Sequence, residues 1–264
     1  MKALSVLILF SISYCLTISN NISFNNKYDI ISATYNGSSR YYILDYFGFV
    51  FAIDSSGNKI AEIDPSKNGL FNPTDIDFSS GYLFIADPSA RAIFITDSYL
   101  RTPTKISLFT SNNEPIAPSK IAISSGRSAL IWDADRGSLF FTDNIVKQSP
   151  LYRLSCPIAK DGVNDIIFDR LLKSFVIIMS GRAIIITPNG IVDGELTFDG
   201  IKSPIAGFEV DSGFAVFSED SMTIFDGENW HKMPAIHCKV VIQSFSGEPF
   251  FFDSNSITFG KLSD

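Results

Sequence analysis

The sequence predicts an all-β fold, a six-bladed β-propeller with four-stranded antiparallel blades that the N- and C-terminal segments close into a ring. Three observations predict it. One hairpin pattern recurs six times, its period is about 42 residues, and the composition favours strands and turns. Phe alone supplies 24 of the 264 residues, whereas the Ala, Glu, Lys and Gln mixture typical of helices is sparse.

Each copy of the hairpin has an apolar strand that usually ends at an acidic or polar residue, then a short turn and a second apolar strand. The copies span 41–54, 82–97, 129–143, 174–187, 213–226 and 249–260. Their first strands end at Asp45, Asp87, Asp133, Ser180, Glu219 and Asp253, which are 42, 46, 47, 39 and 34 residues apart. Because the aspartates recur at one structural position, we expect them to cap turns by accepting backbone N–H bonds rather than to act in catalysis.

Further apolar segments supply the other two strands of each blade. Inner strands are predicted at 74–78, 119–123, 163–168, 204–210 and 239–245, and outer strands at 58–63, 104–109, 150–154, 191–198 and 230–233. The last copy stops soon after Phe259, before a fourth strand. We therefore expect the segment 22–35 to supply that missing strand and also the innermost strand of the first blade, which would hide two sheet edges.

The N-terminus has the pattern of a signal peptide. A lysine precedes an apolar run from Ala3 to about Tyr14, which is too short to span a bilayer. We predict a signal peptide over 1–17 and a single propeller domain over 18–264, with secretion or retention in a secretory or vacuolar lumen. Sequons at Asn21 and Asn36 predict N-glycosylation.

Removing such a leader leaves Cys156 and Cys238, which either pair or are small buried hydrophobes. The net charge of −7 argues against nucleic-acid binding, because it gives no positive field for phosphates. No later run of 18 apolar residues occurs, so we predict no membrane span. We expect a monomer.

Two of the repeats carry a family resemblance. The first has Pro, Gly, Asp and Arg at Pro73, Gly81, Asp87 and Arg91, and the second has them at Pro118, Gly126, Asp133 and Arg136. The pattern resembles the six-bladed propellers of the NHL, YWTD and gluconolactonase-like group, and the second repeat is also similar to secreted Yellow/major royal jelly proteins. The resemblance to the enzymes of this group implies an axial calcium ion that polarises a lactone or ester, and the Yellow resemblance implies an axial cavity for a small ligand.

The predicted inner strands carry the candidate binding residues at the channel mouth. These are Asp75, Asp77, Asn164 and Asp165, with Asn72 just before them. Matching positions in other blades hold Lys120, Ala206 and Val240, which are not oxygen ligands, so the calcium cage is incomplete. We therefore expect no cofactor, with calcium as the open alternative. In the structural alternative, Asp75 and Asn164 accept backbone N–H bonds and face a wet channel.

These features favour a secreted, non-enzymatic binding module for a protein, glycan or small molecule, with specificity in its longer loops around 65–73, 111–118 and 144–150. The alternatives are a calcium-dependent lactonase or ester hydrolase, and a Yellow-like carrier of small ligands. Only His231 and His237 are present, and there is no Gly-x-Ser-x-Gly, phosphate loop or CxxC, so the usual patterns of hydrolytic, nucleotide and zinc sites are missing.

Overall fold

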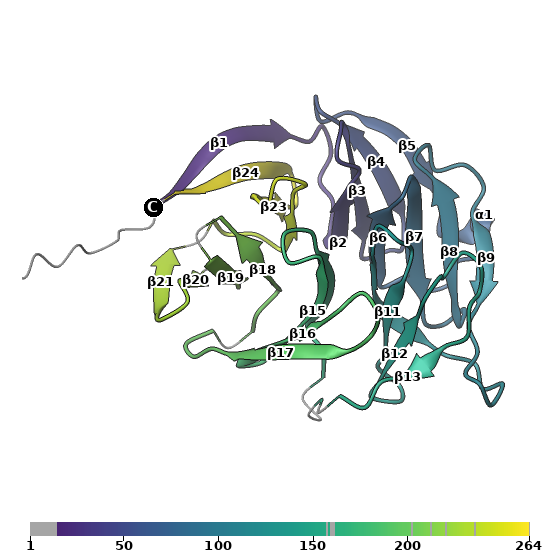
Figure 1. Cartoon of the computed structure of the whole chain (residues 1–264). Helices are drawn as coiled ribbons and strands as arrows, with labels where there is room; N and C mark the ends of the chain where they lie inside the picture. Colours follow the sequence, from purple (N-terminus) through teal and green to yellow (C-terminus); the bar gives the residue numbers. More distant parts are fainter. Residues whose placement is uncertain are drawn as a thin grey trace, which may run out of the picture.

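Six four-stranded antiparallel sheets are arranged around a central axis in the computed structural model (Figure 1). It describes residues 15–263, apart from 157, 159–161, 202, 212, 220 and 235. The predicted six-bladed β-propeller is confirmed. In each of the first five blades the strands follow one another from the axis outward, which is the order that the repeated hairpins and their flanking strands predict.

Blade 1 contains β2 (Ile30–Tyr35), β3 (Arg40–Asp45), β4 (Val50–Asp54) and β5 (Lys59–Ile63). Blade 2 contains β6 (Asp75–Ser79), β7 (Tyr82–Asp87), β8 (Ala92–Asp97) and β9 (Thr104–Ser107). Blade 3 contains β10 (Pro118–Ile123), β11 (Ala129–Asp133), β12 (Ser138–Thr142) and the short β13 (Tyr152–Arg153). Blade 4 contains β14 (Asp165–Asp169), β15 (Ser174–Met179), β16 (Arg182–Ile186) and β17 (Val192–Thr197). Blade 5 contains β18 (Ala206–Val210), β19 (Gly213–Phe217), β20 (Ser221–Phe225) and β21 (Trp230–Pro234).

Blade 6 is closed by both ends of the chain. Its strands β22 (Val240–Gln243), β23 (Pro249–Asp253) and β24 (Ser256–Ser263) are followed by β1 (Cys15–Ser23), which pairs antiparallel with β24. Figure 1 shows the purple β1 beside the yellow β24. Closure by the two termini is confirmed, but the closing strand begins seven residues before the predicted segment 22–35. As the outermost strand it exposes one face, with Ile18 outside and Ile22 buried, so its apolar pattern is weak.

The predicted signal peptide falls partly on this strand. Residues 1–14 lie outside the described part of the chain, and residues 15–17 form the start of β1. The prediction of cleavage near residue 17 stays a prediction. Cleavage there would leave a closing strand of 18–23.

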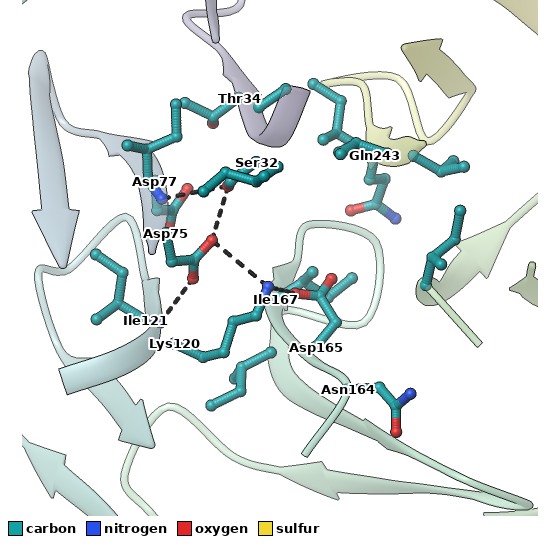
Figure 2. A pocket seen from close by; sticks show the side chains of 18 of the residues that line it. Ser32, Thr34, Asp75, Asp77, Lys120, Ile121, Asn164, Asp165, Ile167 and Gln243 are labelled. Atoms are coloured by element: carbon teal, nitrogen blue, oxygen red, sulfur yellow. Dashed lines mark hydrogen bonds and ion pairs between the residues drawn. The ribbon is translucent and has the colours of Figure 1, made fainter. Parts of the chain in front are cut away.

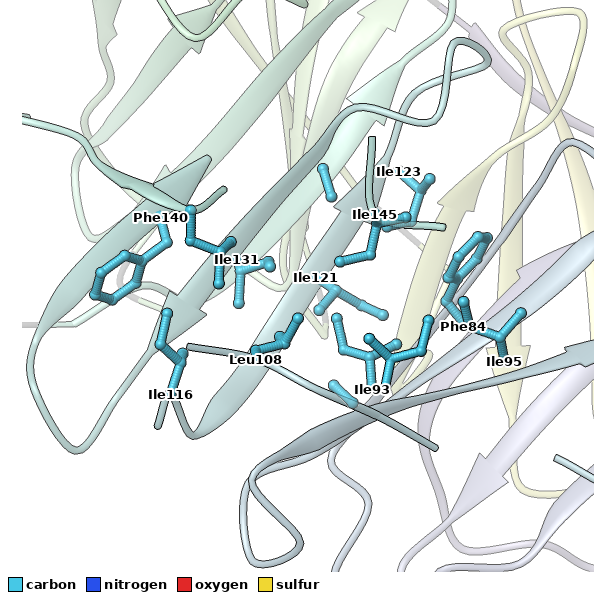
Figure 3. Close-up of a cluster of buried hydrophobic side chains, with 14 residues drawn as sticks. Phe84, Ile93, Ile95, Leu108, Ile116, Ile121, Ile123, Ile131, Phe140 and Ile145 are labelled. Atoms are coloured by element: carbon cyan, nitrogen blue, oxygen red, sulfur yellow. The ribbon is translucent and has the colours of Figure 1, made fainter. Parts of the chain in front are cut away.

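The core consists of side chains packed between neighbouring blades. Between blades 2 and 3, Phe84 and Ile93 pack with Ile121 and Ile131, all of them buried (Figure 3). Because both faces of a blade are covered, its middle strands are continuous apolar runs rather than alternating ones, as in the fully buried β11. This pattern is what made the hairpins visible in the sequence.

Three of the recurring aspartates hold turns, as predicted. Asp45 Oδ1 accepts hydrogen bonds from the backbone N–H groups of Phe47 and Phe49, at 3.0 and 2.9 Å. Asp87 accepts three backbone N–H bonds, and Asp133 accepts two. For Asp253, in contrast, the described part of the chain offers no side-chain hydrogen bond.

The connections of the propeller lie on two faces. We call the face at which the six inner strands begin the start face, and the opposite one the end face. Loops 65–73 and 111–118 lead into inner strands on the start face, whereas loop 144–150 follows β12 on the end face. The three candidate loops therefore do not form one surface. The four-residue α1 (Pro65–Asn68) lies in the first of them, and no helix in the described ranges is long and apolar enough to cross a membrane.

The two remaining cysteines lie in different parts of the core. Cys238 packs between blades 5 and 6, and Cys156 packs against the cluster between blades 3 and 4. They are not joined to each other by a disulfide. Of the two alternatives drawn from the sequence, pairing is not seen; Cys238 is a small buried hydrophobe, and Cys156 is half-buried.

Candidate functional site

An axial cavity of about 280 Å³ opens where the inner strands begin. Four of the five predicted site residues line it: Asp75, Asp77, Asn164 and Asp165. Figure 2 shows Asp75, Asp165 and Asn164 around it, contributed by blades 2 and 4. The fifth, Asn72, is exposed in the loop before β6, and its backbone N–H donates to Asp87. The inner strands placed by the repeat period in the sequence therefore do meet at one cavity.

Asp75 links three blades at the wall of this cavity. Its Oδ1 accepts a hydrogen bond from the Ser32 hydroxyl at 2.7 Å, and its Oδ2 accepts one from the backbone N–H of Ile121 at 2.9 Å. The side chain is buried, so both carboxylate oxygens are satisfied within the protein. The structural alternative, in which Asp75 accepts a backbone N–H bond, therefore holds, but the donor Ile121 lies on the next inner strand rather than in a turn.

Lys120 lies between two carboxylates of the cavity. Its Nζ is 3.5 Å from Asp165 Oδ1 and 3.9 Å from Asp75 Oδ1 (Figure 2). Burial acts to lower the pKa of Lys120, but the two carboxylates outweigh it and the pKa is raised. Burial raises the pKa of Asp165 to about 7, against the opposing effect of Lys120. The ammonium group therefore remains charged and neutralises the acidic side of the cavity.

The inner strands bond to one another in a regular way. Asp77 Oδ2 accepts the backbone N–H of Ile123 at 2.6 Å, two residues along from the Asp75 bond. Burial raises the pKa of Asp77 to about 6. In blade 1, Ser32 and Thr34 accept backbone N–H bonds from β6 in the same manner, both at 3.2 Å. These polar side chains join blade 1 to blade 2 and blade 2 to blade 3.

Asn164 has a different environment. Its backbone N–H donates to Ile178, but in the described part of the chain no group is hydrogen-bonded to its side-chain amide. The Asn164 side chain is thus a polar group of this cavity that is open to a ligand.

The residues at the axis do not fit a calcium cage. Calcium takes six to eight oxygen ligands, whereas the ammonium group of Lys120 lies between the carboxylates that would have to supply them. Both oxygens of Asp75 already accept hydrogen bonds. Within the described ranges no group of three acidic, His or Cys side chains has the arrangement of a metal site.

Sequence reasoning missed the groups that cross the channel farther along the axis. The backbone carbonyl oxygen of Gln243 accepts a hydrogen bond from the Arg170 guanidinium at 2.8 Å. The Gln243 side-chain oxygen accepts one from the Arg170 backbone N–H, and its side-chain nitrogen donates one to Asp169. These contacts join blade 6 to blade 4, 73 residues apart in sequence. Ser32 could have been found, because it occupies the position in blade 1 that Asp75 occupies in blade 2. No repeat position in the sequence indicated Arg170 or Gln243.

The remaining predicted residues lie away from the axis. His231 is on β21, the outermost strand of blade 5, with Nε2 2.7 Å from Asp226 Oδ2. Neither histidine lines the axial cavity. Asn21 is exposed on β1, and the Asn36 side-chain oxygen accepts the N–H groups of the following turn. Glycosylation at these two positions stays a prediction.

Comparison with known proteins supports the fold and no more. No family model matches the sequence, and no curated protein matches it. Among solved structures, a streptogramin B lyase has a TM-score of 0.66 at 9% identity, over 95% of this chain and 98% of that one. A catalytically inactive histidine-to-alanine variant of virginiamycin B lyase from Staphylococcus aureus, with quinupristin, has a TM-score of 0.62 at 11% identity, covering 96% and 100% of the two chains. A nidogen/laminin complex has a TM-score of 0.57 at 15% identity, covering 76% of each.

Proposed function

We propose that this protein is a secreted, non-enzymatic binding module that recognises a partner protein through its start face. The observation that carries the proposal is a group of three aromatic side chains, Tyr46, Phe47 and Phe71, which are 70%, 71% and 73% exposed. Large apolar rings held out in water at loop tips are typical of binding surfaces, where aromatic residues supply much of the binding energy.

The three rings belong to two segments that touch. Tyr46 and Phe47 lie in the turn between β3 and β4, and Phe71 lies in the loop between α1 and β6. Gly48 of the turn packs so closely on Pro73 of the loop that an added Cβ would lie 3.1 Å from the proline ring. The backbone N–H groups of Phe47 and Phe71 donate hydrogen bonds to the carboxylates of Asp45 and Asp87, which fix both segments. The rings are therefore presented on a rigid support at the start face.

The axial cavity itself supports binding better than catalysis. Its carboxylates are occupied by inter-blade hydrogen bonds and by Lys120. The Ser32 hydroxyl that bonds Asp75 is buried and also accepts the Ile76 N–H, so this pair joins two blades rather than forming an accessible nucleophile and base. The lyase activity named for the similar structures does not support a lyase activity in this chain, because an identity of 9–11% shows the fold alone. Both histidines of this chain also lie away from the axial cavity.

The test uses a triple variant, Tyr46→Ala with Phe47→Ala and Phe71→Ala. Its matched control removes two exposed apolar side chains of the end face, Tyr99→Ala with Ile191→Ala. Each purified protein is used to capture partners from an extracellular fraction, and a captured protein is then titrated against each variant. The proposal expects a partner that binds the native chain and the control equally and binds the triple variant at least about tenfold more weakly.

Two results would overturn the proposal. In the first, the triple variant and the control bind every captured partner with equal affinity. In the second, the purified chain hydrolyses lactones or esters with bound calcium and loses this activity in Asn164→Ala, which would replace the binding module by the hydrolase.

A further inference from the structure

A second and larger cavity, of about 690 Å³, opens at the end face. It lies where the inner strands finish, and its wall includes Ile123, Phe168 and Phe245. The side chains of Asp77, Phe168 and Arg170 line both this cavity and the axial one. Arg170 therefore lies at the partition between the two, with its charged group accessible from the end face.

The guanidinium of Arg170 is only partly used by the protein. One nitrogen, Nη1, donates to the Gln243 carbonyl oxygen at 2.8 Å, and the group stacks 3.9 Å above the ring of Phe245. A guanidinium has five N–H donors, and in the described part of the chain no second acceptor lies within hydrogen-bond distance of it. A half-buried cation with unused donors beside an open cavity is suited to bind an anion.

The rest of the cavity determines what kind of anion fits. Phe168, Ile123 and the half-exposed Phe245 give it apolar walls, and Lys173 lies exposed at its rim. Its volume is in the range of about 300–1,000 Å³ common for small-molecule sites. We infer that this end-face cavity binds a small organic anion, whose carboxylate or sulfonate pairs with Arg170 and whose apolar body packs on Phe168 and Phe245.

Two carboxylates face the same site and limit its affinity. Asp143 lies at the rim, and Asp77 lies across the partition from Arg170 with one oxygen bonded to Ile123. Asp77 competes with a bound anion for the guanidinium. Replacing it by Asn, which keeps an acceptor for the Ile123 N–H, should therefore tighten binding. The site lies on the face opposite the aromatic group, and the inference does not depend on the proposed partner protein.

Anilinonaphthalene sulfonate is the probe for the test, because it joins a sulfonate to an apolar ring system. It is titrated into the folded full chain, and octanoate or neutral 1-octanol is then added as a competitor. We expect saturable binding that octanoate reverses and octanol hardly affects. Arg170→Met should weaken octanoate binding at least tenfold and Asp77→Asn should strengthen it. Lys147→Met, which removes an exposed cation of the end face outside this cavity, should change it less than twofold.

Further variants keep the test decisive if Arg170→Met fails to fold. Asn189 lies at the rim of the cavity in an exposed turn, so Asn189→Trp should fill the opening without disturbing the channel. It should abolish octanoate binding while the unfolding midpoint stays unchanged. Equal competition by octanoate and octanol, an equal loss in Lys147→Met, or full binding in Asn189→Trp would each overturn the inference.

Discussion

Replacing Asp87 by alanine should destabilise the propeller by about 3–5 kcal/mol. The side chain is fully buried and accepts backbone N–H bonds from Phe71 and Asn72 at 2.6 and 3.2 Å and from Ala90 at 2.9 Å. Three bonds to a charged acceptor would sum to about 4.5–9 kcal/mol at about 1.5–3 kcal/mol each. The expected loss is smaller because two of the donors belong to exposed residues, which water can reach.

The matched control is Asp253→Ala. Asp253 occupies the same position in blade 6, but it is half-buried and its carboxylate accepts no hydrogen bond within the described ranges. Its loss should destabilise the protein by less than about 1 kcal/mol. Asp87→Asn keeps an acceptor oxygen but loses the charge, so it should lie between the two.

Equilibrium unfolding in urea measures all three variants. Trp132 is buried in blade 3 and reports the transition by fluorescence. Differences in midpoint give the change in the free energy of unfolding, provided that the denaturant slope is unchanged. If Asp87→Ala and Asp253→Ala differ by less than about 1 kcal/mol, the turn-holding role of the repeated aspartates is wrong, and a functional role would have to be considered again.

Three further results are expected from the same urea assay. Ile22→Ala on the closing strand should destabilise the protein by about 2–4 kcal/mol, whereas Ile18→Ala at an exposed position of the same strand should change stability by less than about 0.5 kcal/mol. Equal effects would mean that β1 does not close the ring. Gly57→Ala and Gly69→Ala both place a side chain at positive φ, but only the Cβ at position 57 would meet β1, 2.0 Å from a carbonyl oxygen. Gly57→Ala should therefore lower the free energy of unfolding by about 2 kcal/mol more than Gly69→Ala, and equal losses would mean that this contact is absent. Because burial raises the pKa of Asp165 to about 7 in the folded protein, above about 3.9 in an unfolded chain, its ionisation should lower stability as the pH rises from about 4 to about 7; Asp165→Asn should reduce this fall, and an unchanged pH profile would place the titration elsewhere.

The parts of the fold that the sequence revealed are those with both faces buried. β7, β11 and β15 are unbroken apolar runs because a neighbouring blade covers each side, and their spacing then located the inner and outer strands. The full extent of β1 was not predicted because only one of its faces is covered, so its exposed polar residues resemble those of a loop. The propeller could be predicted from burial, and its exact closure could not.

The candidate site divides in a similar way. Asp75, Asp77 and Asp165 could be placed together because equivalent positions of a ring converge on its axis. The ion pairs of Lys120 and the bond between Arg170 and Gln243 depend on how far a side chain reaches across the channel. No periodicity in a single sequence records that reach, so these contacts had to come from the structure.

The hydrogen bonds between inner strands also make the ring mechanically uneven. Ser32, Thr34, Asp75 and Asp77 tie blades 1, 2 and 3 together through backbone amides, whereas across the junction of blades 3 and 4 the polar side-chain link in the described part of the chain is the Lys120–Asp165 ion pair. An ion pair does not protect an amide from solvent as a hydrogen bond to that amide does. Amide hydrogen exchange should therefore be slow along β6 and β10 and faster on the axial edge of β14, so the junction of blades 3 and 4 should open before the junctions of blades 1 and 2 and of blades 2 and 3.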